Sequence, residues 1–463
     1  MKTVEYYGKL ILICISLLVP LCFAGCEEDD IEEPQDEVEN PADKDGDDEV
    51  EESVPFSLGN YNPTSGSNGT VLNLYGTGFG KDVNNVKVMV NGTEAEVTEV
   101  DGYYIKAKVA KKSGTGQVKV RIGEEELVYE TQFTYNFGTT VSTYFGAKID
   151  DKSGMKYGDL QEARLWKPVS IAFDKDNSLY IVQDEDRDIA MVKDGTVSQF
   201  LDADKTDKCQ QMFNIAFSKD SGYMYISNDG NASGNSNIVS IPWDESAAKY
   251  DVDRLSIFWD RSNITYYVTT VAVHPITGEL FAIYGKDSKI FKYDTTQNKM
   301  VDTGSFLPNL EGNPVNGVKT RCMLFDKAGT TVYFSSQNCS VIYKGDYDIA
   351  NGTFSNIHIW VGQYNQHGWE EGQGTAAKLN RPYQMDMDEE GNLYVAVFNA
   401  NRIAKITPDG IMTCYAGNGT SELKDGPLNE AQFNHPAGIQ FGPDGVLYVA
   451  EYWNHTIRKI ETE

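Results

Sequence analysis

One segment of the sequence occurs three times in nearly the same frame. It reads GDLQEARLWKP at 158–168, GQGTAAKLNRP at 372–382 and GPLNEAQFNHP at 426–436. In each copy the first Gly is followed by Ala five positions on, Leu or Phe seven on and Pro ten on. A proline at this place ends a polar segment and presets the chain for a strand without needing a backbone donor. Such a repeated crossing predicts that the unit following it is repeated as well.

Each copy is followed by a strand, a turn of Gly, Asn or Asp, a second strand centred on an aromatic residue, a polar loop and a third strand. After Pro436, for example, the sequence is AGIQFGPDGVLYVAEYWNHTIRKI. Three weaker copies lie in between, so the second-strand aromatic recurs at Tyr180, Tyr225, Phe281, Tyr333, Tyr394 and Tyr448. Self-similarity at this period, with four strands in each unit, predicts a β-propeller of six blades over residues 139–463.

These copies resemble NHL repeats; the last copy matches best, and the first and fifth match well. The resemblance implies an NHL-type propeller. The sixth unit ends after its third strand, whereas VSTYFG at 141–146 has the shape of a fourth strand. We therefore expect residues 141–146 to close the ring by pairing into blade six, because closure removes an open sheet edge. The Ala and the Leu or Phe of the crossing loops are expected to be buried between blades.

Residues 54–137 form a separate all-β unit in the sequence. Val86, Val88 and Val90 alternate with other side chains, as does the Val118–Ile122 segment, which is typical of strands with one buried face. About 84 residues of short strands fit an immunoglobulin-like sandwich. The segments YNPTSGSNGTVLNLYGTGFG and VKVMVNGTEAEV resemble the IPT/TIG family, which implies a spacer or interaction module and no catalysis.

The first 53 residues are interpreted as an export and anchoring segment. Residues 1–25 carry an apolar run that ends in FAGC and resembles a bacterial lipobox, so we expect a signal peptide and a lipid on Cys26. An ordinary signal peptide with an incidental Cys is the alternative. Residues 26–53 are strongly acidic and almost without apolar side chains, which predicts a disordered linker. The acids after Cys26 resemble the signal that places Bacteroidetes-type lipoproteins on the outer face of the outer membrane.

The formal net charge of −29 argues against nucleic-acid binding, because phosphates would be repelled.

In a propeller, the crossings into the inner strands and the loops between second and third strands emerge on one face. On that face the sequence places aromatic, amide and charged residues, a mixture that suits sugars. The candidate ligand-binding residues are Arg164, Trp166, Tyr284, Arg381, Phe398, Asn399, Tyr452 and Trp453. Asn401, Arg402, Asn454 and His455 are expected to cap turns instead.

The sequence predicts no catalytic, metal or cofactor site. The five histidines lie apart and form no HxH or HxxxH pair, and no GxSxG motif occurs. Four cysteines, Cys209, Cys322, Cys339 and Cys414, are scattered without CxxC spacing, and free thiols are favoured; only Cys322 and Cys339 could pair.

The expected function is therefore non-catalytic binding of a nutrient for an outer-membrane uptake system, and a glycan is the expected nutrient. Membrane contact is expected through the lipid alone. Two alternatives remain open at this stage. A protein–protein scaffold would use the same face with more exposed apolar area. A propeller lyase or lactonase-like enzyme would gather a metal or ionisable groups near the axis.

Overall fold

The computed structural model describes residues 54–148, 150, 154–184, 188–228, 236–261 and 268–462. The predictions for residues 1–53, including a signal peptide at 1–25, a linker at 26–53 and lipidation of Cys26, concern residues outside this part. The described chain is all-β, as predicted, with an immunoglobulin-like sandwich followed by a six-bladed propeller. None of its described helices is long and apolar enough to cross a membrane. Its four described cysteines are free thiols.

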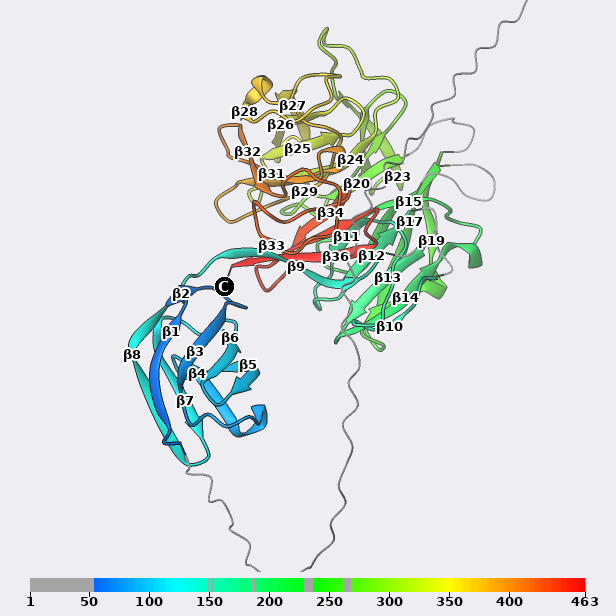
Figure 1. Ribbon diagram of the computed structural model, residues 1–463. Helices are drawn as coiled ribbons and strands as arrows, with labels where there is room; N and C mark the ends of the chain where they lie inside the picture. Colours follow the sequence, from blue (N-terminus) through cyan, green and yellow to red (C-terminus); the bar gives the residue numbers. More distant parts are fainter. Residues whose placement is uncertain are drawn as a thin grey trace, which may run out of the picture. The chain divides into compact units, whose positions relative to one another are not determined.

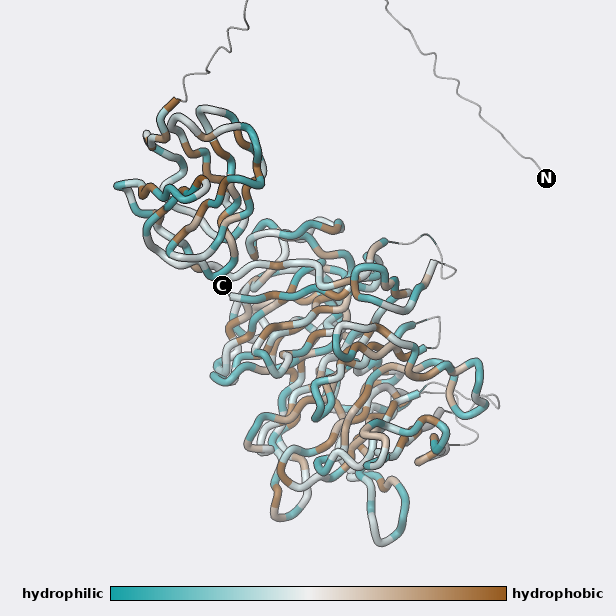
Figure 2. Tube along the Cα trace, turned by 90° about the horizontal axis from the view of Figure 1, so that it is seen from below, coloured by the Kyte–Doolittle hydropathy of each residue, from teal (hydrophilic) through white to brown (hydrophobic). Residues whose placement is uncertain are grey.

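The sandwich owes its core to the predicted two-residue alternation. Val88, Val90, Val118 and Val120 are fully buried, while the side chains between them are exposed or half-buried. Brown and teal segments accordingly alternate along its strands in Figure 2. The strands pair in the order β1-β3-β6-β5-β4-β7-β8-β2. They are β1 (Ser57–Asn62), β2 (Ser65–Gly66), β3 (Val71–Thr77), β4 (Val86–Val90), β5 (Thr93–Asp101), β6 (Tyr104–Lys108), β7 (Gly116–Ile122) and β8 (Glu125–Tyr135).

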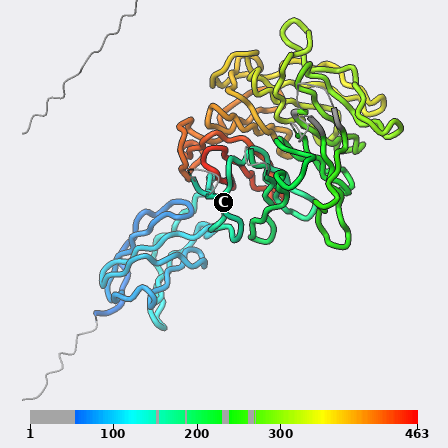
Figure 3. Tube along the Cα trace, turned by 90° about the vertical axis from the view of Figure 1, so that its right-hand side faces the viewer, coloured from blue at the N-terminus to red at the C-terminus, as the bar shows by residue number. Residues whose placement is uncertain are grey.

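The propeller follows the predicted repeat, and the chain passes around it from green through yellow to red in Figure 3. Blade 1 contains β11 (Pro168–Phe173), β12 (Leu179–Gln183), β13 (Asp188–Lys193) and β14 (Thr196–Asp202). Blade 2 contains β15 (Met212–Phe217), β16 (Tyr223–Asn228), β17 (Ser236–Asp244) and β19 (Ser256–Arg261). Blade 3 contains β20 (Val268–Val273), β21 (Leu280–Tyr284), β22 (Lys289–Asp294) and β23 (Lys299–Phe306). Blade 4 contains β24 (Thr320–Phe325), β25 (Thr331–Ser336), β26 (Val341–Asp348) and β27 (Thr353–Val361). Blade 5 contains β29 (Pro382–Met387), β30 (Leu393–Val397), β31 (Arg402–Ile406) and β32 (Ile411–Ala416). Blade 6 contains β34 (Pro436–Phe441), β35 (Leu447–Glu451), β36 (Thr456–Thr462) and β9 (Thr139–Gly146). The first strand of each blade contacts the first strands of both neighbouring blades, so six inner strands surround the axis.

Strand β9 closes the ring as predicted. It pairs antiparallel with β36, from Thr139 opposite Thr462 to Gly146 opposite Thr456, and lies beside β36 in Figure 1. The last strand of the sixth blade is thus supplied from the start of the propeller. This pairing leaves β36 without an open edge.

The three repeated crossing loops also add a fifth strand to the blades that they enter. Their first two residues form β10 (Gly158–Asp159), β28 (Gly372–Gln373) and β33 (Gly426–Pro427), which pair with β14, β32 and β9. The recurring Gly is explained by its φ of +134°, +159° and +140° in the three copies. The recurring Ala and Leu or Phe are fully buried, as predicted: Ala163, Leu165, Ala377, Leu379, Ala431 and Phe433.

Candidate functional site

All six inner strands begin with the same irregularity. In blade 1, Pro168 pairs with Gln183 and Ser170 with Val182, so one extra residue stands between the two pairs. The corresponding shift occurs at the start of β15, β20, β24, β29 and β34. Such a β-bulge redirects a side chain and is common beside functional sites. The second residues of the six strands, which lie at the bulges, are Val169, Phe213, Thr269, Arg321, Tyr383 and Ala437.

A second repeated position lies directly after the second strand of each blade. In blades 1, 4, 5 and 6 its backbone N–H donates to the carbonyl of the residue preceding the inner strand of the same blade. The pairs are Asp184 with Lys167 (3.0 Å), Gln337 with Lys319 (2.9 Å), Phe398 with Arg381 (3.0 Å) and Tyr452 with His435 (3.0 Å). This bond fixes Asp184, Gln337, Phe398 and Tyr452 next to the bulge residues of the inner strands.

Arg321 brings together side chains of three blades. Its guanidinium carbon lies 4.8 Å from the ring centroid of Phe213 and 5.0 Å from that of Tyr383. Its Nε donates to Oε1 of Gln337 at 2.7 Å. Because guanidinium groups are attracted to aromatic faces, these contacts hold the cation in one place.

The contacts continue from Tyr383 through blades 5, 6 and 1. The Tyr383 and Phe398 rings are stacked with centroids 4.4 Å apart, and Phe398 meets Tyr452 edge to face at 5.4 Å. The Tyr452 hydroxyl donates to Oδ2 of Asp184 at 3.3 Å, and Gln211, two residues before Phe213, donates to Oδ1 of Asp184 at 3.0 Å. The contacts therefore run from Phe213 through Arg321, Tyr383, Phe398 and Tyr452 to Asp184, and Gln211 links Asp184 to the segment that carries Phe213. We call Asp184, Phe213, Arg321, Tyr383, Phe398 and Tyr452 the axial ring.

An aromatic cluster around Lys167 adjoins the axial ring. The Lys167 ammonium lies 4.6 Å from the ring of Trp453, 5.1 Å from Trp166 and 5.5 Å from Tyr452. Trp453 is 41% exposed, so part of the cluster is open to solvent. Trp166 is half-buried and stacks on His455 at 4.7 Å with 5° between the ring planes.

Side chains of one blade hold the crossing loop that leads into the next. His455 Nδ1 accepts from the backbone N–H of Lys167 at 3.0 Å, and Asn401 Oδ1 accepts from that of His435 at 3.0 Å. Burial, together with the Lys167 and Lys148 cations, lowers the pKa of His455 to about 4, which favours the neutral acceptor form. Burial and the Arg381 charge also lower the pKa of His435. Asn401 and His455 were expected to cap turns, and these two bonds instead join their side chains to the crossing loop of the next blade.

The two other expected capping residues bind backbone carbonyls as well. Arg402 Nη2 donates to the carbonyl of Asn418 at 2.8 Å, and Asn454 Nδ2 donates to that of Glu422 at 3.0 Å. Both side chains thus have a structural role, because each fastens a loop through a backbone carbonyl.

Of the eight candidate residues, Phe398 and Tyr452 belong to the axial ring, and Trp166 and Trp453 to the Lys167 cluster. Arg381 is exposed and directly precedes β29. Arg164 is half-buried and donates to the carbonyls of Gln161 and Ala163, while the Asn399 N–H donates to the carbonyl of Asn380.

Tyr284 does not lie on the expected surface, because it is 2% exposed and packs in the core of its blade. The reason is register. Tyr284 pairs with Val268 as the last residue of β21, just as Val397 pairs with Pro382. The residue equivalent to Phe398 and Tyr452 is therefore Gly285, one position further on.

Lys167, Asp184, Phe213, Arg321 and Tyr383 are not among the eight candidate residues that the sequence indicated. A signal for Tyr383 was present, because it follows Pro382 as Val169 follows Pro168 and Ala437 follows Pro436. The same repeat position thus carries Val, Tyr and Ala, a variation that packing alone does not require.

His274 is fully buried. Its Nδ1 accepts from the N–H groups of Ile276 and Thr277, so Nε2 carries the proton and donates to the Gly329 carbonyl at 2.8 Å. His274 therefore fastens blade 3 to blade 4.

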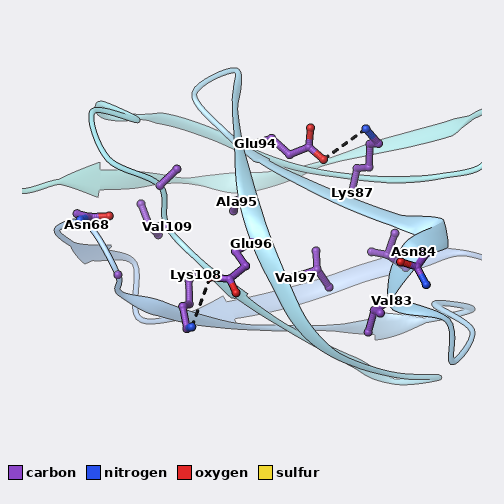
Figure 4. A pocket seen from close by; sticks show the side chains of 13 residues that line it. Asn68, Val83, Asn84, Lys87, Glu94, Ala95, Glu96, Val97, Lys108 and Val109 are labelled. Carbon is purple, nitrogen blue, oxygen red and sulfur yellow. Dashed lines mark hydrogen bonds and ion pairs between the residues drawn. The ribbon is translucent and has the colours of Figure 1, made fainter. Parts of the chain in front are cut away.

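A groove of about 630 Å³ lies on the sandwich, lined by residues of β4, β5 and β6 (Figure 4). Its charged side chains are joined in cross-strand pairs, Lys87 with Glu94 at 3.3 Å and Lys108 with Glu96 at 3.4 Å. Such pairs are the ordinary stabilisation of an exposed sheet. The described residues also contain no group of three or more His, Cys, Asp or Glu placed to hold a metal ion.

Comparison with protein families gives three matches along the chain. Residues 57–135 match the IPT/TIG domain, residues 316–416 the SMP-30/Gluconolactonase/LRE-like region, and residues 433–460 the NHL repeat. Among curated proteins, NHL repeat-containing protein 2 of Homo sapiens is 32% identical over 97 residues, and its Gallus gallus counterpart is 36% identical over 83 residues. These matches cover 20% and 18% of this chain, and the chain spans only 13% and 11% of those relatives.

Solved structures are similar over most of the chain. The crystal structure of an auxiliary nutrient binding protein from Bacteroides thetaiotaomicron superimposes with a TM-score of 0.67 and 25% identity, covering 88% of this chain and 98% of that one. An auxiliary nutrient binding protein from Bacteroides ovatus has a TM-score of 0.66 and 24% identity with the same coverage. The chain is thus an IPT/TIG domain followed by a six-bladed propeller, with Bacteroides nutrient-binding proteins among its structural neighbours.

Proposed function

We propose that this protein is a non-catalytic binding protein for a nutrient, that the nutrient is a glycan, and that the axial ring with the Lys167 cluster is its binding site. The observation that carries the proposal is the meeting of aromatic and hydrogen-bonding side chains from five blades at one place. These side chains come from two repeat positions and include Phe213, Arg321, Tyr383, Tyr452 and Asp184.

The composition of the site suits a saccharide. Aromatic faces such as that of Trp453 can stack on the apolar faces of sugar rings. Gln211 and Gln337 supply amides, and Asp184 and Arg321 supply groups that bind pairs of hydroxyls. Support from comparison comes from the Bacteroides thetaiotaomicron nutrient-binding protein, which is 25% identical over nearly its whole length.

The proposed location is the outer face of the outer membrane, with a lipid on Cys26 and the acidic residues 26–53 as a linker. The proposed partners are components of an outer-membrane uptake system. Metabolic labelling with a radioactive fatty acid tests the anchor: the parent chain should be labelled and sediment with membranes, and Cys26→Ala should do neither. Membrane association that is unchanged in Cys26→Ala would contradict the anchor.

Binding is tested by calorimetry of the purified chain against a panel of neutral and acidic oligosaccharides. Phe213→Ala should weaken binding several-fold, because one stacking contact is worth on the order of 1 kcal/mol. Tyr103→Ala is the matched control, since Tyr103 is a 64% exposed aromatic residue of the sandwich. The saccharide should be recovered unchanged after incubation; a cleaved product would favour an enzyme. Equal affinity for Phe213→Ala and the parent would place the site elsewhere.

A further inference from the structure

We infer that the ligand carries an anionic group, a carboxylate or a sulfate ester, and that Arg321 binds it with help from Arg381 and Lys167. The inference rests on the proposed function and narrows its ligand class to acidic saccharides. It begins with charge. The whole chain has a net charge of −29, yet its axial ring and the adjoining positions bring together three cations, and the ring itself contains one carboxylate, Asp184.

The positions of the three cations follow from the fold. Arg321 stands at the bulge of β24, and Lys167 and Arg381 directly precede the prolines that open β11 and β29. Lys167 and Arg381 have φ of +48° and +61°. His435, at the equivalent position before Pro436, has φ of +57°. The left-handed backbone is therefore a property of this repeat position, and blades 1 and 5 place a cation on it.

Arg321 is prepared for a planar anion. The rings of Phe213 and Tyr383 flank its guanidinium, and the buried Gln337 accepts from Nε at 2.7 Å. The Nη1 and Nη2 groups lie on another edge of the same rigid fork, whose spacing matches two oxygens of a carboxylate or sulfate. A guanidinium that is already oriented loses little conformational entropy when it binds.

Arg381 and Lys167 extend the positive potential around this fork. Burial raises the pKa of the Tyr383 hydroxyl, the charge of Arg321 opposes that shift, the charge of Asp184 adds to it, and the charge of Arg381 opposes it, so both cations act on the same ring residue. Lys167 is held over Trp453 at 4.6 Å. The one ring carboxylate, Asp184, already accepts from Tyr452 and Gln211. Of the described charged residues in the ring and at the two positions beside it, three are cations and one is a carboxylate.

The test compares three probes by calorimetry on the purified full-length chain: cellotetraose, tetragalacturonate and a sulfated tetrasaccharide. We expect one or both acidic probes to bind at least about tenfold more tightly than cellotetraose, with an affinity that falls as salt increases. Binding of only the uronate or only the sulfated probe would identify which anion the site takes.

Two variants separate charge from geometry. Arg321→Gln should reduce binding of the acidic probe by about tenfold or more, and Arg321→Lys, which keeps the charge but loses the planar fork, by several-fold. Arg121→Gln removes an exposed cation of the sandwich and should bind like the parent. Thermal melting of each variant tests whether the fold is retained.

Two results would overturn the inference, and they differ in what else they remove. If cellotetraose binds as tightly as the acidic probes and Arg321→Gln binds like the parent, the anionic ligand is wrong while the proposed glycan binding stands. If none of the three probes, and no saccharide of the wider panel, binds the parent chain, the proposed function fails together with the inference.

Discussion

The Nδ1 atom of His455 accepts a hydrogen bond from the backbone N–H of Lys167 at 3.0 Å, across 288 positions of the sequence. The bond joins the last blade to the crossing loop of the first, beside the pairing of β36 with β9. Asn401 makes the equivalent bond to the N–H of His435 one blade earlier. A side-chain acceptor at this repeat position thus couples the junction of two blades to the backbone of the site.

This bond predicts a pH dependence. The folded-state pKa of His455 is about 4, below the ordinary value of 6.5, because burial and the Lys167 charge disfavour its protonated form. Its contribution to stability is therefore fully present above pH 6.5 and is lost as the pH falls through 4. We expect His455→Asn, which copies Asn401, to lose less stability than the parent between pH 6.5 and 4 in urea unfolding experiments.

The comparison with the parent is needed because Asp386 titrates in the opposite sense. Burial raises its pKa from 3.8 to about 6, so its contribution is fully present below pH 3.8 and is lost as the pH rises through 6. This term is common to the parent and His455→Asn, and it cancels in their difference. Parallel stability curves for the two proteins between pH 4 and 6.5 would contradict the assigned role of His455.

A second prediction concerns the buried ion pair of blade 6. Glu451 and Arg458 are both fully buried, with 2.9 Å between Oε2 and Nη1, and Arg458 also reaches Asp425 at 2.6 Å. Removing Glu451 leaves a buried guanidinium with less compensation, so Glu451→Ala should lower the free energy of unfolding by about 3–5 kcal/mol. The control is Glu126→Ala, which breaks the exposed pair with Lys119 and should cost less than about 1 kcal/mol. Equal losses for the two variants would refute this difference.

The architecture could be predicted from the sequence because its signals are periodic. The spacing of second-strand aromatics indicated six blades, and the missing fourth strand of the last unit indicated closure by residues 141–146. Burial of Ala163 and Leu165 followed from their recurrence in the crossing loop. In each case the signal is a pattern along the sequence that can be read without knowing which strands pair.

The axial ring could not be predicted in the same way, because it depends on register between two strands. Phe213, Arg321 and Tyr383 are positioned by bulges, and a bulge is defined by the partner strand rather than by alternation along one strand. The same limitation explains Tyr284. Without the pairing of Tyr284 with Val268, nothing in the sequence YGKD (284–287) shows which residue is the last of the strand.

A third prediction tests ring closure. A chain that begins at residue 139 keeps β9, whereas a chain that begins at residue 151 leaves the edge of β36 unpaired. The longer chain should melt cooperatively and remain monomeric, and the shorter one should melt at a lower temperature and aggregate. Thermal denaturation and size-exclusion chromatography measure both properties, and equal melting temperatures would contradict closure by β9.

The last prediction separates two tryptophans of the Lys167 cluster. Trp453 is 41% exposed, so Trp453→Ala should weaken saccharide binding several-fold with little change in melting temperature. Trp166 is stacked on His455, and its backbone N–H donates to Gln183 Oε1 at 2.7 Å. Trp166→Ala removes the stacking partner of His455, which holds the blade junction. It should therefore weaken binding and also lower the free energy of unfolding by roughly 2 kcal/mol or more. If both variants lose binding but neither loses stability, the His455 junction contributes less than its contacts indicate; if Trp453→Ala binds like the parent, the exposed face of Trp453 is not part of the site.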